Sequence, residues 1–366
     1  MEKHVITDDA ALAQLRRRLL ARSAPGGTPA AAARLESVRA IVEAVRTEGD
    51  AAVARFTEQF DGVRLAPERF ELTREEIEAA GSRVDPETLA ALGRAMENIR
   101  DFHARNLRES WEREYPDGSV IGQRVGPVES AGVYVPGGKA FYPSSVLMNI
   151  VPARVAGVTE IIMVSPPSHN GDIHPGVVAA ARMAGATRVF RVGGAQAVAA
   201  LAYGTETIPA VCKITGPGNA YVTAAKALVR GAVEIDSEAG PSEVLVLADA
   251  STNPRFAAAE LFAQAEHDEE AMCLLVSDNE QTADAVAAVV DAELPALQRA
   301  GIASRALEEL GLLIVARSAA EAVDLANFIA PEHLSVQTRD AEATAKQIHN
   351  AGAVMVGPMT PVAVGD

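Results

Sequence analysis

The sequence predicts an α/β protein with two Rossmann-like, doubly wound parallel-sheet domains and a helical N-terminal region. One observation is the length, because 366 residues exceed what a single hydrophobic core usually organises and favour two or three domains. The other is a pattern after about residue 160, where short apolar runs alternate with Ala-rich helical stretches. Strands separated by helices form parallel sheets with right-handed crossovers. The alternation is long enough for two such sheets.

Short apolar runs mark the expected strands of these sheets. Each is bounded by turn residues and followed by a helical stretch, of which Ala220–Val229 and Ala319–Phe328 are examples. The runs are Glu160–Ser165, Arg188–Val192, Val211–Ile214, Val244–Ala248, Met272–Val276, Leu312–Val315, Leu334–Gln337 and Val354–Val356.

Before residue 120 the chain is predicted to be mainly helical, because apolar residues recur at helical spacing among dense charges. The clearest helix runs to Arg105. It begins after Asp85, a good N-cap, with Pro86 at the first helical position, where the missing N–H costs nothing. The segment Ile121–Val135 then alternates like a short pair of strands.

Composition and charge narrow the partners and the compartment. The 33 Lys and Arg against 49 Asp and Glu leave a formal charge of −16, which disfavours nucleic acid as a partner. No uncharged apolar stretch is long enough to span a membrane, and the basic patch Arg16–Arg18 has no apolar region after it, so neither a membrane segment nor a secretory leader is predicted. Two cysteines are too few for a disulfide framework and favour a reducing compartment, the cytoplasm.

Glycine-containing turns follow three of the predicted strands, where open α/β sheets bind ligands. The first, Thr215-Gly216-Pro217-Gly218-Asn219, opens a helix whose N-terminal N–H groups suit an anionic group such as a pyrophosphate. The others are Gly193-Gly194-Ala195-Gln196 and, after Tyr134, Pro136-Gly137-Gly138. Each alone is typical of a plain turn. Three at strand ends favour a dinucleotide-binding crevice.

A candidate metal site lies at the end of the predicted helix Phe256–His267. Gln264 and His267 are three residues apart and share one face of that helix, so an amide oxygen and an imidazole nitrogen could converge on one ion. Zinc is the expected metal, although glutamine is an uncommon zinc ligand. The alternative is a polar helix end with His267 favoured by the helix dipole.

An acid and a base follow one another on a predicted turn at the edge of the sheet. Glu332 and His333 lie between a helix and a strand, where general acid–base groups are often found. The alternative is a capping glutamate beside a half-buried histidine. A further carboxylate, Asp366, ends the chain after Gly365 and has no evident structural task.

Taken together, these motifs and their order resemble histidinol dehydrogenase over nearly the whole chain. That family oxidises L-histidinol to L-histidine through an enzyme-held aldehyde, reducing two NAD, as the closing step of histidine synthesis. The motifs that carry the resemblance are Tyr134-Val135-Pro136-Gly137-Gly138, Val192-Gly193-Gly194-Ala195-Gln196-Ala197, Gly216-Pro217-Gly218-Asn219-Ala220, Ala239-Gly240-Pro241-Ser242-Glu243, Gln264-Ala265-Glu266-His267, Pro331-Glu332-His333-Leu334 and Gly365-Asp366.

The resemblance implies a zinc site and a substrate site. Gln264, His267 and Asp366 match the zinc ligands of the family and, through the metal, contact the substrate's amino and imidazole nitrogens. Ser242 and His333 match further substrate-binding residues. The expected substrate is therefore L-histidinol, held partly by Zn²⁺.

The resemblance also implies the catalytic and dinucleotide-binding residues. Glu332 matches the carboxylate that activates water to attack the aldehyde, and His333 matches the neighbouring acid–base that removes protons at the hydride-transfer steps. Tyr134, Gln196 and Asn219 match the NAD contacts. All three lie in or beside the glycine-containing turns.

The expected organisation is an N-terminal helical arm at 1–26, a discontinuous α/β domain at 27–133 and 244–366 that carries the zinc and catalytic residues, and a Rossmann-like NAD-binding domain at 134–243. The family further implies an intertwined homodimer. The sequence stops at Asp366, where the family continues into a segment with another zinc ligand and two substrate contacts. The alternative function is therefore an impaired, truncated form that only binds a dinucleotide or metal, and a zinc hydrolase is a third.

Overall fold

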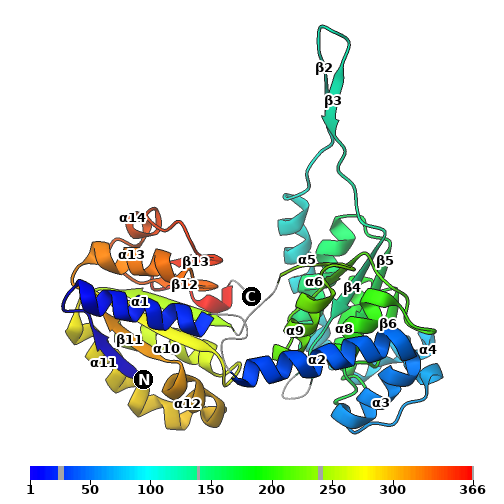
Figure 1. The fold of residues 1–366 in the computed structure, drawn as a ribbon, viewed down its shortest axis with the longest axis horizontal. Helices are drawn as coiled ribbons and strands as arrows, with labels where there is room; N and C mark the ends of the chain where they lie inside the picture. The colour runs from blue at the N-terminus through cyan, green and yellow to red at the C-terminus, as the bar shows by residue number, and fades with distance from the viewer. Residues whose placement is uncertain (24–28, 138–140, 238–241, 365–366) are drawn as a thin grey trace. The chain divides into compact units, whose positions relative to one another are not determined.

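The computed structural model describes residues 1–23, 29–137, 141–237 and 242–364. The chain folds into two compact units (Figure 1). We call Met1–Gly27 with Gly240–Asp366 the split unit, because two separate pieces of chain build it, and Thr28–Ala239 the central unit.

The split unit is a parallel sheet covered on both faces. Its strand order is β1-β11-β10-β9-β12-β13, and every adjacent pair is parallel. The strands are β1 (Glu2–Val5), β9 (Glu243–Ala248), β10 (Met272–Ser277), β11 (Leu312–Val315), β12 (His333–Val336) and β13 (Ala353–Val356). One face packs on α10 (Pro254–Ala265), α11 (Glu280–Glu293) and α12 (Ala300–Glu309). The other packs on α1 (Asp9–Ser23), α13 (Ala319–Ile329) and α14 (Ala341–Ala345). Short 3₁₀ turns follow α11 at η3 (Leu294–Ala296) and β13 at η4 (Val362–Val364).

The central unit is a second parallel sheet with the order β6-β5-β4-β7-β8. Its strands are β4 (Ser130–Tyr134), β5 (Glu160–Val164), β6 (Arg188–Phe190), β7 (Lys213–Thr215) and β8 (Glu234–Ile235). The strand order reverses between β4 and β7, which is the topological switch point at which doubly wound sheets bind ligands beyond their carboxyl ends.

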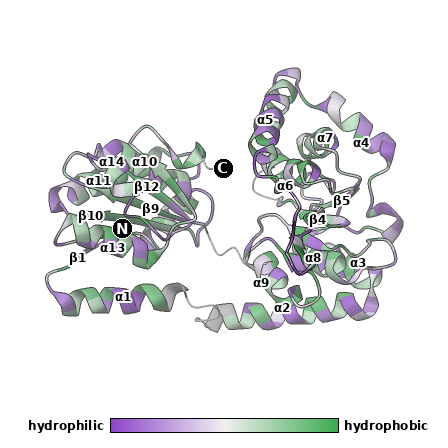
Figure 2. Ribbon diagram, turned by 90° about the horizontal axis from the view of Figure 1, so that it is seen from above, coloured by the Kyte–Doolittle hydropathy of each residue, from purple (hydrophilic) through white to green (hydrophobic). Residues whose placement is uncertain are grey.

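Helices cover both faces of the central sheet as well. One face carries α2 (Pro29–Glu48), α3 (Asp50–Asp61), α8 (Gly194–Tyr203) and α9 (Ala220–Val229). The other carries α4 (Arg74–Ala80), α5 (Pro86–Ala104), α6 (Pro143–Val155) and α7 (Pro175–Ala184), with the 3₁₀ turn η2 (Gly81–Arg83) beside them, while the 3₁₀ turn η1 (Pro67–Arg69) contacts α3. Figure 2 shows hydrophobic residues along the strands and both hydrophobic and hydrophilic residues along α2, as expected of a helix with one buried face.

The α/β class, the parallel sheets and the expected strands are confirmed, with boundaries shifted by one or two residues. Leu312–Val315 is a strand with the predicted bounds. The helix predicted from Asp85 is α5, in which the Asp85 carboxylate accepts a hydrogen bond from Thr88 N at 2.7 Å and Arg105 is the C-cap.

The N-terminal arm and the strand pair at Ile121–Val135 differ from prediction. The arm begins with β1, whose residues pair with β11 at one edge of the split unit's sheet. Strand β4, inside the predicted pair, joins the central sheet between β5 and β7. The rest of the predicted pair, β3 (Val120–Gln123), instead forms an antiparallel hairpin with β2 (Trp111–Glu114).

The domain boundaries also differ. Residues 27–133 were expected to join 244–366, but Thr28–Ala239 forms one unit. The physical reason is burial: Val38, Ile41 and Val45 of α2 and Val53 of α3 pack into the same core as α8 and α9. These helices therefore complete the central sheet.

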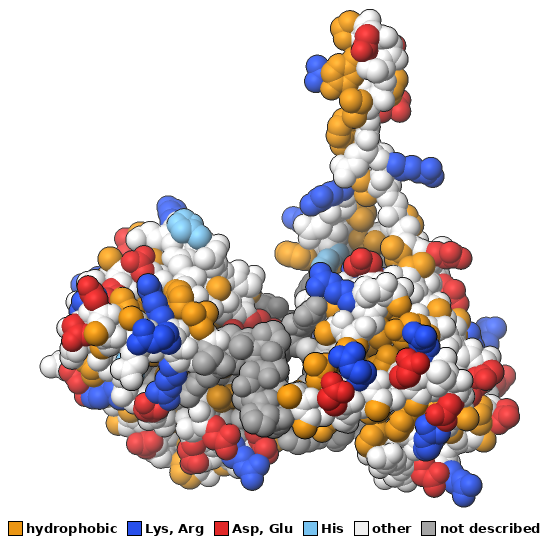
Figure 3. All heavy atoms as spheres, viewed as in Figure 1, with side chains coloured by type: hydrophobic (Ala, Val, Ile, Leu, Met, Phe, Trp, Pro, Cys, Tyr) orange, Lys and Arg blue, Asp and Glu red, His pale blue; other side chains and the backbone are white. Residues whose placement is uncertain are grey.

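The β2–β3 hairpin projects away from the body of its own unit (Figure 1). Both strands are exposed along their whole length. Orange, hydrophobic side chains gather on it in Figure 3, and the exposed fractions of Trp111, Val120 and Ile121 are 54%, 60% and 56%. Across the described ranges, the search for a helix long and apolar enough to cross a membrane finds none.

Candidate active site

The predicted acid–base pair lies at the amino edge of the split unit's sheet. Strands β9 and β12 are neighbours, and His333, the first residue of β12, pairs with Val244 of β9. Ser242 therefore lies beside Glu332 and His333. Ser242 also accepts a hydrogen bond on its carbonyl oxygen from Met272 N at 3.0 Å, at the start of β10.

The backbone of one residue, Glu243, contacts both members of the pair. Glu243 N donates to Glu332 Oε2 at 3.1 Å, and the carbonyl oxygen of Glu243 lies 3.2 Å from His333 Nδ1. A carbonyl only accepts, so Nδ1 carries the proton in this bond. The two side chains are 3.6 Å apart, between His333 Nδ1 and Glu332 Oε2.

The two side chains differ in their access to water. The Glu332 side chain is 48% exposed and the His333 side chain 12% exposed. Glu332 can therefore reach a water molecule, whereas His333 is a sheltered base whose orientation is set by the strand. This division of roles suits one group that activates water and one that handles the proton of a bound substrate.

Glu243 is a candidate site residue that sequence reasoning missed, although it is part of a quoted motif. Burial is the largest cause that raises the pKa of its carboxyl group, and the negative charge of Glu332 raises it further. Raised carboxyl pKa values cluster at functional sites. The signal in the sequence was only its place after Ser242, because the pairing of β9 with β12 is not visible in the chain order.

The predicted metal ligands Gln264 and His267 lie at the same amino edge of the split unit's sheet. Helix α10 connects the parallel strands β9 and β10, so its C-terminus must come back to the amino edge where β10 begins. The helix ends at Ala265 rather than at His267 as predicted. His267 lies in the turn that follows, where its N–H donates to the carbonyl oxygen of Gln264 at 3.2 Å, a tightening common at helix C-termini.

The residues present fit a zinc ion. Gln264 is 4% exposed, and no hydrogen-bond partner of its amide is found within the described part of the chain, which leaves an amide oxygen free to bind. His267 is exposed, so its imidazole is accessible. A neutral oxygen and an imidazole nitrogen are acceptable donors for zinc.

The third expected ligand, Asp366, lies outside the described residues. One turn before Gln264, the carboxylate of Glu260 accepts a hydrogen bond from Val362 N at 2.9 Å, so η4 packs against α10 a few residues before the chain reaches Asp366. Among residues 1–23, 29–137, 141–237 and 242–364, no three His, Cys, Asp or Glu side chains form a metal-binding group. Of the three expected ligands, Gln264 is not one of these residue types and Asp366 lies outside the described residues. Only His267 could therefore count toward such a group.

The predicted dinucleotide contacts lie at the carboxyl edge of the central sheet. Tyr134 ends β4, and its hydroxyl accepts a hydrogen bond from Gly194 N at 3.2 Å. Burial raises the pKa of Tyr134 to about 12, so the hydroxyl keeps its proton and can donate it. Gly216 has φ +116°, and a Cβ there would lie 2.1 Å from the carbonyl oxygen of Tyr134. Only glycine therefore permits this close approach of the two strand ends.

Polar side chains without partners surround this junction. Gln196 is 1% exposed, and within the described residues neither its Nε2 nor its Oε1 has a hydrogen-bond partner. Thr215 Oγ1 is likewise buried without one. Asn219 caps α9 by accepting from Tyr221 N at 3.0 Å and Val222 N at 3.1 Å, which leaves its amide NH₂ for a ligand. Buried polar groups are nearly always satisfied, so these point to a polar ligand.

An ion pair with a buried lysine supports the turn after β7. Lys226, 3% exposed in its side chain, contacts Asp236 and donates to the carbonyl oxygen of Gly216 at 3.0 Å. Gly216 N donates to Asp236 Oδ2 at 2.8 Å. Sequence reasoning missed both residues, because Lys226 reads as an ordinary position in a helix. Their effect is to hold the glycine turn rigid beneath the polar groups.

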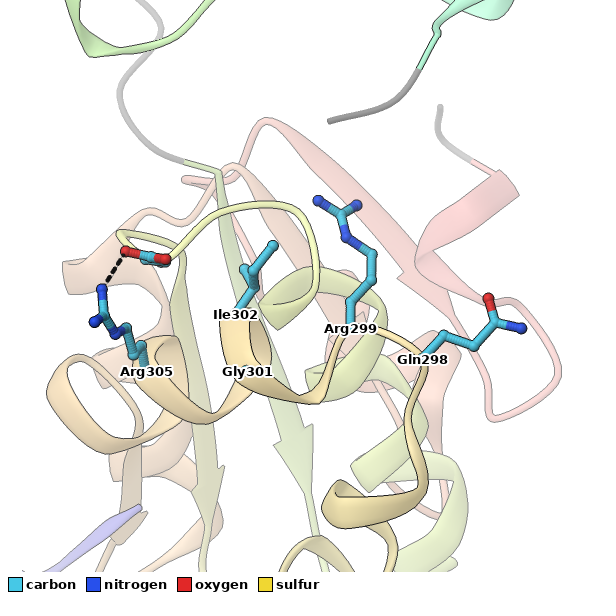
Figure 4. Close-up of a pocket in the computed structure, with 6 residues that line it drawn as sticks. Gln298, Arg299, Gly301, Ile302 and Arg305 are labelled. Atoms are coloured by element: carbon cyan, nitrogen blue, oxygen red, sulfur yellow. Dashed lines mark hydrogen bonds and ion pairs between the residues drawn. The ribbon is translucent and has the colours of Figure 1, made fainter. Parts of the chain in front are cut away.

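A shallow hollow of the split unit lies beside the turn after α10 but includes none of the predicted site residues. Its lining comes from that turn and from the start of α12: Glu269, Gln298, Arg299, Gly301, Ile302 and Arg305 (Figure 4). Glu269 and Arg305 pair at 2.8 Å. Arg299 Nη2 has no hydrogen-bond partner within the described residues, but a guanidinium group does not exchange protons near neutral pH, so we assign the hollow no part in the acid–base chemistry.

Comparison with known proteins agrees with this geometry. Residues 28–366 match the family model described as histidinol dehydrogenase. The histidinol dehydrogenase of Halalkalibacterium halodurans is 48% identical over 330 residues, which cover 90% of this chain and 77% of that protein. That of Pseudomonas syringae pv. syringae is 50% identical over 327 residues, covering 89% and 73%. The crystal structure of histidinol dehydrogenase from Elizabethkingia anophelis has a TM-score of 0.89 at 34% identity, covering 100% of this chain and 82% of that one.

Proposed function

Because the chain belongs to the histidinol dehydrogenase family, we propose that it oxidises L-histidinol to L-histidine through histidinal, reducing two NAD, in histidine biosynthesis. The observation that carries the chemistry is the backbone of Glu243, which contacts both Glu332 and His333. A base that is fixed in orientation beside a carboxylate open to water is what successive alcohol and aldehyde oxidation requires.

In the first oxidation, His333 accepts the proton of the substrate hydroxyl while a hydride leaves the carbinol carbon for NAD, giving the aldehyde and NADH. Glu332 then accepts a proton from water as the water oxygen attacks the aldehyde carbon. Protonated His333 returns its proton to the aldehyde oxygen as the water adds, which completes the hydrate. The hydrate then transfers a hydride from the same carbon to a second NAD, and His333, neutral again, accepts a hydroxyl proton. Ser242, at the start of the neighbouring strand, contacts the substrate.

Gln264, His267 and Asp366 would hold Zn²⁺ at the amino edge of the same sheet. The support within the described residues is the position of Gln264, which is 4% exposed, and the exposed imidazole of His267. When bound, zinc would orient the substrate through its amino and imidazole nitrogens and polarise its oxygen.

The central unit would bind NAD at its switch point. Tyr134 and Gln196 supply buried polar groups there, and Asn219 supplies its NH₂ beside the N-terminus of α9. Helix N-termini favour phosphate groups through free N–H groups and the helix dipole. The arrangement therefore suits the pyrophosphate and the polar edges of the dinucleotide.

We further propose a homodimer in the cytoplasm. The support for a dimer is the β2–β3 hairpin, whose exposed apolar residues (Figure 3) would be covered by a second copy, since an isolated two-stranded hairpin is marginally stable. The support for the compartment is the small number of cysteines.

The proposed substrate is tested by following NADH absorbance with L-histidinol and, in parallel, with L-phenylalaninol, which keeps the amino alcohol and replaces the imidazole by a phenyl ring. We expect NADH formation with L-histidinol and little with L-phenylalaninol, because the second cannot use the ring nitrogen. Equal rates with both would reject imidazole recognition. If neither compound yields NADH, the proposed dehydrogenase activity is rejected.

A further inference from the structure

Asp61 stands out in the central unit as an acid in an unfavourable place. It is the last residue of α3, at the negative end of the helix dipole, where a carboxylate is disfavoured. Its Oδ2 is buried and has no hydrogen-bond partner within the described ranges. Burial raises the pKa of Asp61 to about 6. Such unsatisfied groups are costly and are found chiefly at functional sites.

The packing of α3 brings Asp61 to the dinucleotide end of the sheet. At the start of α3, Asp50 N donates to Glu206 Oε2 at 2.8 Å, and Asp50 Oδ1 accepts from Thr207 Oγ1 at 3.0 Å. Glu206 and Thr207 follow the C-terminus of α8. The two helices pack together and therefore run antiparallel, so the end of α3 lies near the start of α8.

The start of α8 carries Gly194 and Gln196, which belong to the proposed NAD site. Asp61 is close enough to Tyr134 for its negative charge to contribute, after burial, to the raised pKa of the tyrosine. Beyond Asp61, Val63 Cγ1 would be 3.8 Å from a Cβ at Gly171, in the loop that follows β5. Asp61 thus lies at the carboxyl edge of the central sheet, near Tyr134, whose hydroxyl accepts a hydrogen bond from Gly194 N, two residues before Gln196.

The central sheet lacks the acid that usually serves a dinucleotide. In doubly wound sheets an Asp or Glu at the end of the second strand accepts a hydrogen bond from a ribose hydroxyl. Here the second strand is β5, and the residues that follow it are Ser165-Pro166-Pro167-Ser168, none of which is acidic. A carboxylate supplied from α3 can take that role.

We propose that Asp61 binds NAD by accepting a hydrogen bond from a ribose hydroxyl. This assignment rests on the proposed function, because it requires the dinucleotide to occupy the switch point between β4 and β7. When NAD is bound, its ribose hydroxyl donates a hydrogen bond to Asp61 Oδ2, which has no partner within the described residues of the ligand-free protein. The negative charge of Asp61 also repels the extra phosphate that NADP carries on its ribose. Asp61 therefore favours NAD over NADP.

The test is calorimetric titration of NAD and NADP into the whole chain and four variants, with thermal unfolding of each ligand-free protein. Asp61→Asn keeps the shape and removes the charge. Glu58→Gln removes an exposed charge from the same helix and is the matched control, and Gln196→Ala reports on the proposed NAD site itself.

We expect Asp61→Asn to weaken NAD binding by about 10–100-fold, the usual range for a hydrogen bond to a charged group, and to narrow the preference for NAD over NADP. Its unfolding temperature should equal or exceed that of the wild type, because a buried unpaired charge is removed. Glu58→Gln should change neither the affinity for NAD nor the unfolding temperature.

Wild-type NAD affinity in Asp61→Asn, together with loss of affinity in Gln196→Ala, would overturn this assignment and leave the NAD site standing. Wild-type affinity in both variants would overturn the NAD site as well. A lower unfolding temperature of Asp61→Asn would assign Asp61 a structural role and contradict the proposal. Asp61→Glu, which keeps the charge, should retain more NAD affinity than Asp61→Asn if the proposal holds.

Discussion

At the scale of single residues, Glu332 and His333 both contact the backbone of Glu243 but differ in the exposure of their side chains. We therefore expect their substitutions to affect different steps of the reaction. Glu332→Gln keeps the shape and removes the base. We expect the second oxidation, from histidinal, to slow by ~10²–10⁴-fold, the usual contribution of a general base, and the first, from histidinol, to slow less. The measurement is the rate of each half-reaction with its own substrate. Glu342→Gln, an exposed carboxylate of the same unit, is the control, and equal losses in both half-reactions would contradict the role.

The raised pKa of Asp61 predicts how stability depends on pH. Its ordinary value is 3.8 and burial raises it to about 6, so the folded protein holds this proton more tightly than the unfolded chain does. The stabilisation is complete below the ordinary value and is lost as pH rises through about 6. The neighbouring Tyr134, with a pKa of about 12, stays protonated throughout this window.

The advantage of Asp61→Asn over the wild type in unfolding temperature should therefore grow as pH rises from 4 to 7. Thermal unfolding of both ligand-free proteins at several pH values measures it. A difference that stays constant, or that shrinks as pH rises, would show that the Asp61 carboxylate is not held in an unfavourable setting.

Residues of the site were predictable where they stand in motifs and unpredictable where their meaning depends on packing. Gln196 and Asn219 lie in glycine-containing turns after strands, which are visible in the sequence. Asp61 stands at the end of a helix whose antiparallel packing on α8 no local pattern reveals. Glu243 looks like one more strand residue until β12 is placed beside β9.

At the scale of elements, burial decided which predictions succeeded. Strands such as β11, with all four residues buried, are continuous apolar runs and were found. The edge strand β1, Glu-Lys-His-Val, is polar and was taken as part of a helical arm. The predicted helix through His267 stops at Ala265 because a turn tightens there, a boundary effect that periodicity does not resolve.

The position of His267 just beyond α10 leads to a prediction about the metal. His267→Ala should lower zinc affinity by at least ~10–100-fold, the range seen when even an outer partner of a ligand is lost, while NAD affinity is kept, because the proposed NAD contacts belong to the other unit. Metal analysis and NAD titration measure the two separately. His349→Ala, an exposed histidine of the same unit, is the control, and a full zinc content in His267→Ala would make Gln264 and His267 a plain helix end.

At the scale of the whole molecule, the hairpin tests the proposed dimer. Ile121 lies opposite Arg113 in the hairpin register and is 56% exposed. Ile121→Glu should shift the protein toward monomer, because a charge would have to be buried against the second copy. Light scattering coupled to gel filtration measures the molecular mass. Leu20→Glu, which places the same charge on an exposed leucine of α1, should remain dimeric, and an unchanged dimer in Ile121→Glu would exclude the hairpin from the interface.

The central claim is that one protein carries L-histidinol through two oxidations. The most direct measurement is the amount of NADH and of L-histidine formed from a limiting, known amount of L-histidinol with excess NAD and added zinc. The account predicts two NADH and one L-histidine for each L-histidinol consumed, with no histidinal left. One NADH with accumulated histidinal would contradict the role of Glu332 as the base for water. No NADH from a folded protein that binds NAD would contradict the proposed function and favour a protein that only binds the dinucleotide or the metal.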